Sequence, residues 1–146
     1  MVTKNWYECK VIMAKQLEDG TKKKTTENYL VNAVNCTEAE ARAIEELSPY
    51  CNGDMSVPDI KNVKYSEVIR TEDEQADKYY KTKVSFIFID EDDTEKKSSC
   101  YYLVQANNLQ NAIKAFIDAM RDCMNDYEIN AVQETKNKDV FSTNNQ

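Results

Sequence analysis

The sequence predicts an α+β fold in which two β-β-α-β repeats pack with pseudo-twofold symmetry around one shared core. Three observations predict it. Residues 6–47 align without a gap over residues 79–120, both segments open with a strand-like run, and both end in an amphipathic helical pattern. With 146 residues the chain has the length of one ordinary domain, so we expect a single domain over residues 1–146.

The internal repeat is the most specific feature of the sequence. At a constant offset of 73 residues, 15 of the 42 aligned pairs are identical, including Asn35 with Asn108 and Ile44 with Ile117. An ungapped match of this length indicates duplication of one structural unit. We place repeat one at 5–69, an acidic linker at 70–78, repeat two at 79–141 and a flexible tail at 142–146.

Each repeat is predicted to begin with two antiparallel strands. Aromatic and β-branched residues mark the first strands at Trp6–Leu17 and Tyr79–Asp90, and the return strands follow at Thr25–Val34 and Ser98–Ala106. In the first repeat Asp19-Gly20 is a typical two-residue hairpin turn.

A helix and a closing strand follow in each repeat. Thr37 and Glu40 have the spacing of a capping box, and Asn108 is a suitable N-cap for the second helix. The closing strands are predicted at Val57–Ile69 and Tyr127–Glu134. Because a repeat of about 70 residues is small for a core of its own, we expect the halves to pack on each other like the subunits of a dimer.

The composition excludes several kinds of catalysis. The chain has no histidine, which removes Ser-His and Cys-His nucleophiles. Its two glycines, Gly20 and Gly53, are too few and too far apart for a P-loop or a GxGxxG motif. No other arrangement of residues indicates catalysis, so we expect a protein that is not an enzyme, with no catalytic residue and no cofactor.

The cysteines and the N-terminus point to a reducing compartment. The five cysteines have no CxxC spacing, which favours packed, reduced thiols over a metal site, although a zinc site built from four distant cysteines is the alternative. The opening MVTKNWYECK has no apolar signal-peptide core, and no run approaches 18 apolar residues. We expect no membrane attachment and a location in the bacterial cytoplasm or in a phage-infected host cell.

Alternation along the first strands separates a core face from a candidate binding face. The core face carries Tyr7, Cys9, Val11 and Met13 in repeat one and Tyr80, Thr82, Val84, Phe86 and Phe88 in repeat two. On the opposite face an aromatic residue precedes a lysine by four positions in both repeats: Trp6 with Lys10, and Tyr79 with Lys83. With Tyr101, these residues suggest a platform on which unpaired bases stack while ammonium groups contact phosphates. The alternative is an ordinary half-exposed sheet face whose aromatic and lysine side chains cover one another.

The predicted hairpin tips are the second candidate site. Lys22, Lys23 and Lys24 in repeat one and Lys96 and Lys97 in repeat two place positive charge at matched positions in a chain with a net charge of −7. These lysines suit a phosphate backbone or a small anion. Each group also follows acidic residues closely, so local ion pairing in a solvated turn is the alternative. The acidic net charge argues against duplex binding, which normally requires a basic face.

The chain also resembles a known family. The motifs are Trp6–Val11, Tyr29–Arg42, Lys83–Glu91 and Tyr102–Ala106, which together span most of the chain. They resemble an uncharacterised domain-of-unknown-function family of Bacteroidales and their phages. The resemblance implies a phage or mobile-element context, with no assigned activity and no catalytic residues to carry over.

Two functions remain open from the sequence. The first is a non-enzymatic phage or mobile-element accessory protein that binds single-stranded nucleic acid through Trp6, Lys10, Tyr79, Lys83, Tyr101 and the lysines of the two tips. The alternative is a protein-interaction or counter-defence module that binds a host protein or a small anionic ligand. A homo-oligomer is compatible with either function.

Overall fold

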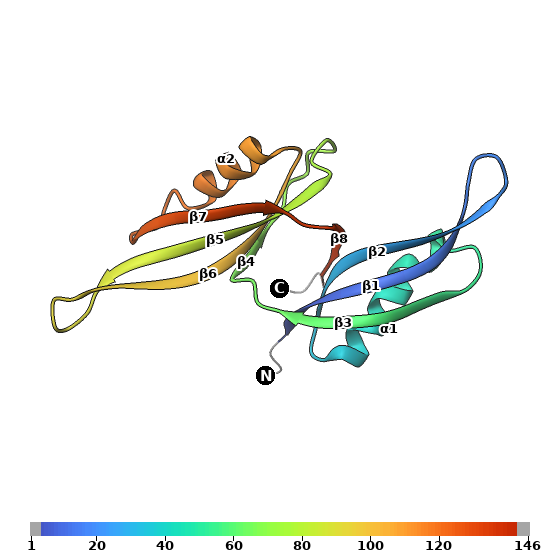
Figure 1. Cartoon of the computed structure of the whole chain (residues 1–146), viewed down its shortest axis with the longest axis horizontal. Coiled ribbons are helices and arrows are strands. Elements are labelled where there is room, and N and C mark those ends of the chain that lie inside the picture. The colour runs from blue at the N-terminus through green and yellow to red at the C-terminus, as the bar shows by residue number, and fades with distance from the viewer. Residues whose placement is uncertain (1–3, 143–146) are drawn as a thin grey trace. The chain divides into compact units, whose positions relative to one another are not determined.

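The computed structural model describes residues 4–142 and has an α+β fold that is mostly sheet. The described residues form two four-stranded sheets, two α-helices and a short 3-10 helix at Ser48–Tyr50. They are divided into two compact units (Figure 1): unit 1 comprises residues 4–64 and 136–142, and unit 2 comprises residues 65–135. Of the predicted tail at 142–146, residues 143–146 lie outside the described residues.

Unit 1 is a sheet of strand order β3-β1-β2-β8 with one helix on it. Its elements are β1 (Asn5–Gln16), β2 (Lys22–Ala33), α1 (Cys36–Leu47), β3 (Met55–Val63) and β8 (Asn137–Phe141). β1 is antiparallel to both β2 and β3, whereas β8 runs parallel to β2. Helix α1 covers one face of this sheet (Figure 1).

Unit 2 repeats this arrangement with the strand order β7-β5-β6-β4. Its elements are β4 (Glu67–Ile69), β5 (Lys78–Ile89), β6 (Glu95–Ala106), α2 (Leu109–Ala119) and β7 (Asp126–Glu134). β5 is antiparallel to β6 and β7, and β4 runs parallel to β6. Each unit therefore has a β-β-α-β order completed by one further parallel strand.

That parallel strand comes from the other half of the sequence, which corrects the predicted closing strand Val57–Ile69. β3 ends at Val63, and the following segment forms β4 on the edge of β6 in unit 2. In the same way, the segment after β7 forms β8 on the edge of β2 in unit 1. The exchange covers a sheet edge in each unit that would otherwise present unpaired N–H and C=O groups.

The other strand predictions are confirmed with small shifts. The first strands and the closing strand of repeat two agree with β1, β5 and β7 within a residue at either end. β2 and β6 begin three residues earlier than predicted, so Lys22–Lys24 pair with β1 as strand and are not part of the turn. The turn is longer than the expected two residues: Leu17 donates its N–H to the carbonyl of Thr21 at 2.7 Å, and Gly20 has a φ of 88°.

Asparagine caps both helices. The Asn108 side chain accepts a hydrogen bond from the backbone N–H of Asn111, as predicted. The predicted helix start at Thr37, with Glu40 in a capping box, is wrong by two residues. Asn35 is the N-cap, and its side chain accepts a hydrogen bond from the backbone N–H of Glu38 at 2.8 Å. An extended asparagine whose side-chain oxygen meets an orphan N–H is a preferred helix start.

The buried side chains form two clusters, one in each unit, where the sequence led us to expect one core. In unit 1 the predicted core face of β1 is buried against Ala39, Ala43 and Leu47 of α1. In unit 2 the face centred on Val84 packs on Phe116 of α2. Phe88, which we predicted in the core, is 45% exposed at the end of β5.

Candidate functional site

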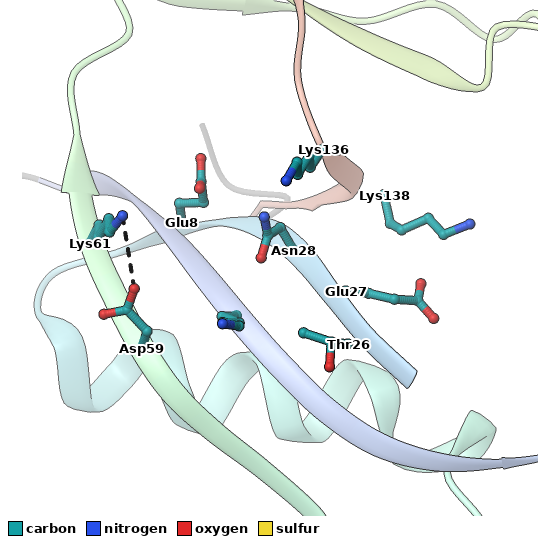
Figure 2. A pocket seen from close by; sticks show the side chains of 9 residues that line it. Glu8, Thr26, Glu27, Asn28, Asp59, Lys61, Lys136 and Lys138 are labelled. Atoms are coloured by element: carbon teal, nitrogen blue, oxygen red, sulfur yellow. Dashed lines mark ion pairs between the residues drawn. The ribbon is translucent and has the colours of Figure 1, made fainter. Parts of the chain in front are cut away.

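A cleft of about 460 Å³ lies on unit 1. Its lining is rich in charged side chains: Glu8, Lys10, Thr26, Glu27, Asn28, Asp59, Lys61, Lys136 and Lys138. Figure 2 shows Lys61 and Asp59 on one side of this cleft, Lys138 and Glu27 on the other, and Asn28 and Lys136 between them. The strands lie in front of α1 in this view, so the cleft is on the side of the sheet away from the helix.

Strand alternation and register assemble the cleft. Lys10 pairs with Asn28 on one side and with Asp59 on the other, so these three side chains share one face of the sheet. Lys61 lies opposite Glu8 in the next row. Strand β8 brings in the last lysines from the far end of the chain, because it pairs with β2 beside Asn28.

The charges of the cleft are only partly compensated. Lys61 forms a long ion pair of 4.0 Å with Asp59. Lys10, Lys136 and Lys138 are exposed and form no ion pair among residues 4–142. Positive charge is thus available here in a chain whose net charge is −7.

Glu27 is the carboxylate that is already neutralised. It accepts a hydrogen bond from Lys15 Nζ at 2.6 Å and another from the Tyr29 hydroxyl at 3.0 Å. Burial acts to raise the pKa of Glu27, but these two hydrogen bonds and the charges of Lys15 and Lys138 outweigh it and hold the pKa below its usual value. Burial and the hydrogen bond to Glu27 raise the pKa of Tyr29 in turn.

Two of the three lysines at the start of β2, Lys22–Lys24, extend the face of Lys10 toward the hairpin. Lys22 and Lys24 pair with Gln16 and Ala14, which alternate with the core residues of β1. They therefore lie on the face of Lys10, whereas Lys23 lies opposite Lys15 on the helix side. All three lysines are exposed. Trp6 lies on the same face as Lys10 and is half-buried.

The predicted residues of unit 2 have neighbours of their own. Tyr79 is only 2% exposed, which corrects its predicted role as a stacking platform. Tyr101 lies opposite Lys83, and Lys81 Nζ lies 4.5 Å from the centre of its ring. This is the arrangement of mutually covering aromatic and lysine side chains that the sequence left as an alternative.

The lysines at the hairpin of unit 2 also have acidic partners. Lys97 contacts Glu128 at 3.2 Å, and Lys96 lies 3.8 Å from Asp90. Of the predicted site residues, the structure therefore groups Trp6, Lys10, Lys22 and Lys24 on one face of unit 1.

Sequence reasoning missed Lys61, Lys136 and Lys138. The place of Lys61 could have been predicted, since it follows Asp59 by two residues on a predicted strand and so shares its face. The other two lie in a polar segment after repeat two, and nothing local to it indicates that β8 joins the sheet of repeat one.

A second cavity, of about 600 Å³, opens between α1 and the β2–β8 edge of unit 1. Met13, Tyr29 and Phe141 form part of its wall, and the two rings stack with centroids 5.2 Å apart. Lys15, Glu27 and Lys138 border it as well. Lys138 and Glu27 thus line both cavities of this edge.

Two further titratable groups in the cores have raised pKa values. Burial, with neighbouring Cys36 and Glu40, raises the pKa of Cys9 to about 12, which makes it a poor nucleophile. Burial also raises the pKa of Tyr102 to about 12. Among residues 4–142 no group of three or more Cys, Asp or Glu side chains is placed to hold a metal ion.

These features define an α+β protein of two sheet-and-helix units, one of which carries a lysine-lined cleft. A family model described as Domain of unknown function (DUF4494) matches residues 5–143, and the chain belongs to this family. Comparison with curated proteins and with solved structures finds no match. Neither helix in the described part of the chain has the length and apolar character needed to cross a bilayer.

Proposed function

We propose that the lysine-lined cleft of unit 1 binds single-stranded nucleic acid, and that the protein is a non-enzymatic accessory protein of a phage or mobile element acting in the bacterial cytoplasm. The observation that carries this proposal is the gathering of Lys10, Lys61, Lys136 and Lys138 around one cleft. Three of these ammonium groups have no ion-pair partner in the described chain. An ammonium group without a carboxylate partner is free to contact a phosphate.

The shape of the basic surface favours a single strand over a duplex. Lys22 and Lys24 extend the face of the cleft along β2, which suits one flexible backbone that follows the strand. Trp6 on the same face supplies a ring for one base. Glu8, Glu27 and Asp59 also line the cleft and keep the basic surface narrow, whereas a duplex needs a broader basic face. The packing of the two units about an approximate twofold axis stays a prediction that this proposal does not require.

The test is an anisotropy titration of labelled single-stranded oligonucleotides at low and moderate salt. Four phosphate contacts predict that the logarithm of the affinity falls with the logarithm of the salt concentration at a slope of about −3. The variants Lys136→Gln and Lys138→Gln should each weaken binding about fivefold, since an exposed ion contact contributes about 1 kcal/mol. The matched control is Lys114→Gln, which removes the same charge from the exposed face of α2 and should bind like the wild type.

Three outcomes contradict the proposal: absence of binding at low salt, equal losses in Lys114→Gln and Lys138→Gln, or equal affinity for duplex and single strand. A small anionic ligand is the alternative occupant of the cleft. It would be indicated if a nucleoside monophosphate competed with the oligonucleotide as strongly, per phosphate, as an unlabelled strand does.

A further inference from the structure

The hairpin end of unit 2 carries an exposed apolar patch. Met124 is 95% exposed, Ile89 is 70% exposed and Phe88 is 45% exposed, and all three line one open cavity of about 530 Å³. Exposed apolar residues scattered singly are ordinary, but large side chains gathered at one place mark an interaction surface.

The hairpin of unit 1 forms without such a patch, so the fold does not require it. Phe88 and Ile89 pair with Lys96 and Glu95 at the end of β5. Lys15 and Gln16 hold the equivalent positions at the end of β1, where they pair with Lys23 and Lys22. A polar pair thus closes the same hairpin in unit 1.

The patch has an acidic border. Asp93, Glu95 and Asp126 line its cavity, and Glu91 and Asp92 lie in the adjoining loop. The lysines nearby, Lys96 and Lys97, are already paired with Asp90 and Glu128. Such a surface repels phosphate backbones and anionic lipid headgroups and attracts an apolar segment with basic neighbours.

The hairpin end of unit 1 has the complementary chemistry. Leu17 is 43% exposed and Tyr50 is 69% exposed. Tyr50 lines a cavity with Gln16, the residue before Leu17, so both apolar side chains belong to one end of the sheet. Lys22, Lys23 and Lys24 follow in β2, are exposed and form no ion pair among the described residues. The carboxylates of this end lie apart from that run, Glu18 and Asp19 in the loop and Glu46 on α1, so the basic surface is the exposed run on β2.

We propose that the apolar acidic end of unit 2 docks on the apolar basic end of unit 1 in a second copy of this chain. Apolar side chains meet in the middle of the contact, and lysines face carboxylates at its border. Because the two surfaces differ, the contact is head-to-tail and leaves one free end on each molecule, so association continues beyond a dimer into rings or chains. The contact needs no nucleic acid, and it covers Lys22 and Lys24, so it competes with a strand for these two lysines while leaving the cleft lysines uncovered.

The experiment is sedimentation of the full chain without nucleic acid over a range of protein concentrations. The wild type should form a concentration-dependent series of oligomers that shrinks as salt rises from about 0.05 M to about 0.5 M, since screening weakens exposed charge pairs. Ile89→Ser and Met124→Ser should weaken association at least about tenfold without a change in charge, by the hydrophobic transfer estimate for two large side chains. Leu109→Ser and Ile117→Ser, at exposed apolar positions of α2, should not change it.

A charge-reversal pair distinguishes head-to-tail docking from any other association. Lys22→Glu with Lys24→Glu removes the basic end, and Glu95→Lys with Asp126→Lys removes the acidic end. Each double variant alone should be monomeric, because both of its ends then carry charge of the same sign. An equimolar mixture should associate again, because the unchanged ends of the two variants match and the two reversed ends match each other. The proposal is overturned if the wild type stays monomeric at low salt, if Ile89→Ser associates like the wild type, or if the mixture stays monomeric. Its failure leaves the nucleic acid proposal intact, since that proposal is tested by oligonucleotide titration of Lys136→Gln, and Lys136 lines the cleft but not the cavity of Gln16 and Tyr50.

Discussion

Single polar residues in this protein gain their properties from neighbours that lie far away in the sequence. Glu27 is an unremarkable strand residue until Lys15, across the hairpin, and Tyr29 donate hydrogen bonds to its carboxylate. Its side chain is only 10% exposed, so the ion pair is shielded from solvent more than the typical surface pair. The two N-cap asparagines are different, because their role depends only on the residues that follow them.

Replacing Glu27 should destabilise the protein in a pH-dependent way. Because the folded pKa of Glu27 is lowered, its contribution is fully present above the unfolded pKa of about 4.3 and is lost as the pH falls through the folded pKa. Glu27→Gln should therefore lower the free energy of unfolding by about 1–2 kcal/mol at pH 7. Urea denaturation at pH 7 and at about pH 3 checks this, with the exposed loop variant Glu18→Gln as control. An equal deficit at both pH values would show that the ionised carboxylate is not the stabilising form.

The same element carries different side chains in the two units, and this changes the core beneath each helix. In unit 2, Phe116 of α2 packs edge-to-face on Tyr102 and Tyr127, with ring centroids 5.1 and 5.7 Å apart. Phe86 completes this cluster. In unit 1 the position of Phe116 is held by Ala43, and a cavity of about 600 Å³ opens between α1 and the sheet edge. Ala43 is itself fully buried and does not line this cavity, so the two cores differ here in aromatic content and not in burial.

Truncating the central ring of that cluster should be costly. Phe116 is fully buried, so Phe116→Ala should lower the free energy of unfolding by about 3–5 kcal/mol through lost contacts and a new cavity. Phe88→Ala removes an equal volume from a side chain that is 45% exposed and should cost less than about 1 kcal/mol. Chemical denaturation followed by near-ultraviolet circular dichroism measures both. Similar losses in the two variants would contradict the assignment of the core.

At the scale of the whole molecule, each unit depends on a strand from the other half of the sequence. β8 brings Val140, which is 3% exposed, and Phe141, which stacks on Tyr29. It also carries Lys138 to the cleft. Unit 1 thus cannot be completed by residues 4–64 alone.

Ending the chain after Thr135 should expose this dependence. Loss of β8 leaves the edge of β2 unpaired and uncovers two apolar side chains, so unit 1 should lose about 3 kcal/mol or more of stability. Hydrogen exchange should show faster exchange in β2, with β5 and β6 protected as before. Oligonucleotide binding should weaken as well, because the cleft loses Lys136 and Lys138 and unit 1 loses stability. A chain ending after Ser142 keeps β8 and is the control; unchanged protection of β2 in the shorter chain would contradict the inference.

How far the sequence predicts this protein depends on the distance over which each signal acts. Strand faces and helix starts follow from neighbouring residues, so Tyr7 to Met13 in the core and Asn108 at a helix start were predictable. The capping box at Thr37 was wrong because Asn35, two residues earlier, competes for the same role. Alternation placed Tyr79 correctly on the face opposite the core face, but alternation alone does not show whether other parts of the chain cover that face, and Tyr79 is buried.

By itself, the sequence predicted the β-β-α-β order of each half and most of the side chains that face each helix, since periodicity and capping are local physical requirements. Only the tertiary structure decided that β4 and β8 are exchanged between the halves, because strand pairing depends on which sheet edge is open and not on the strand's own residues. The same exchange decided the candidate site. Lys136 and Lys138 join Lys10 and Lys61 only when β8 pairs with β2, some 100 residues away in the sequence by the separation of Asn28 and Asn137.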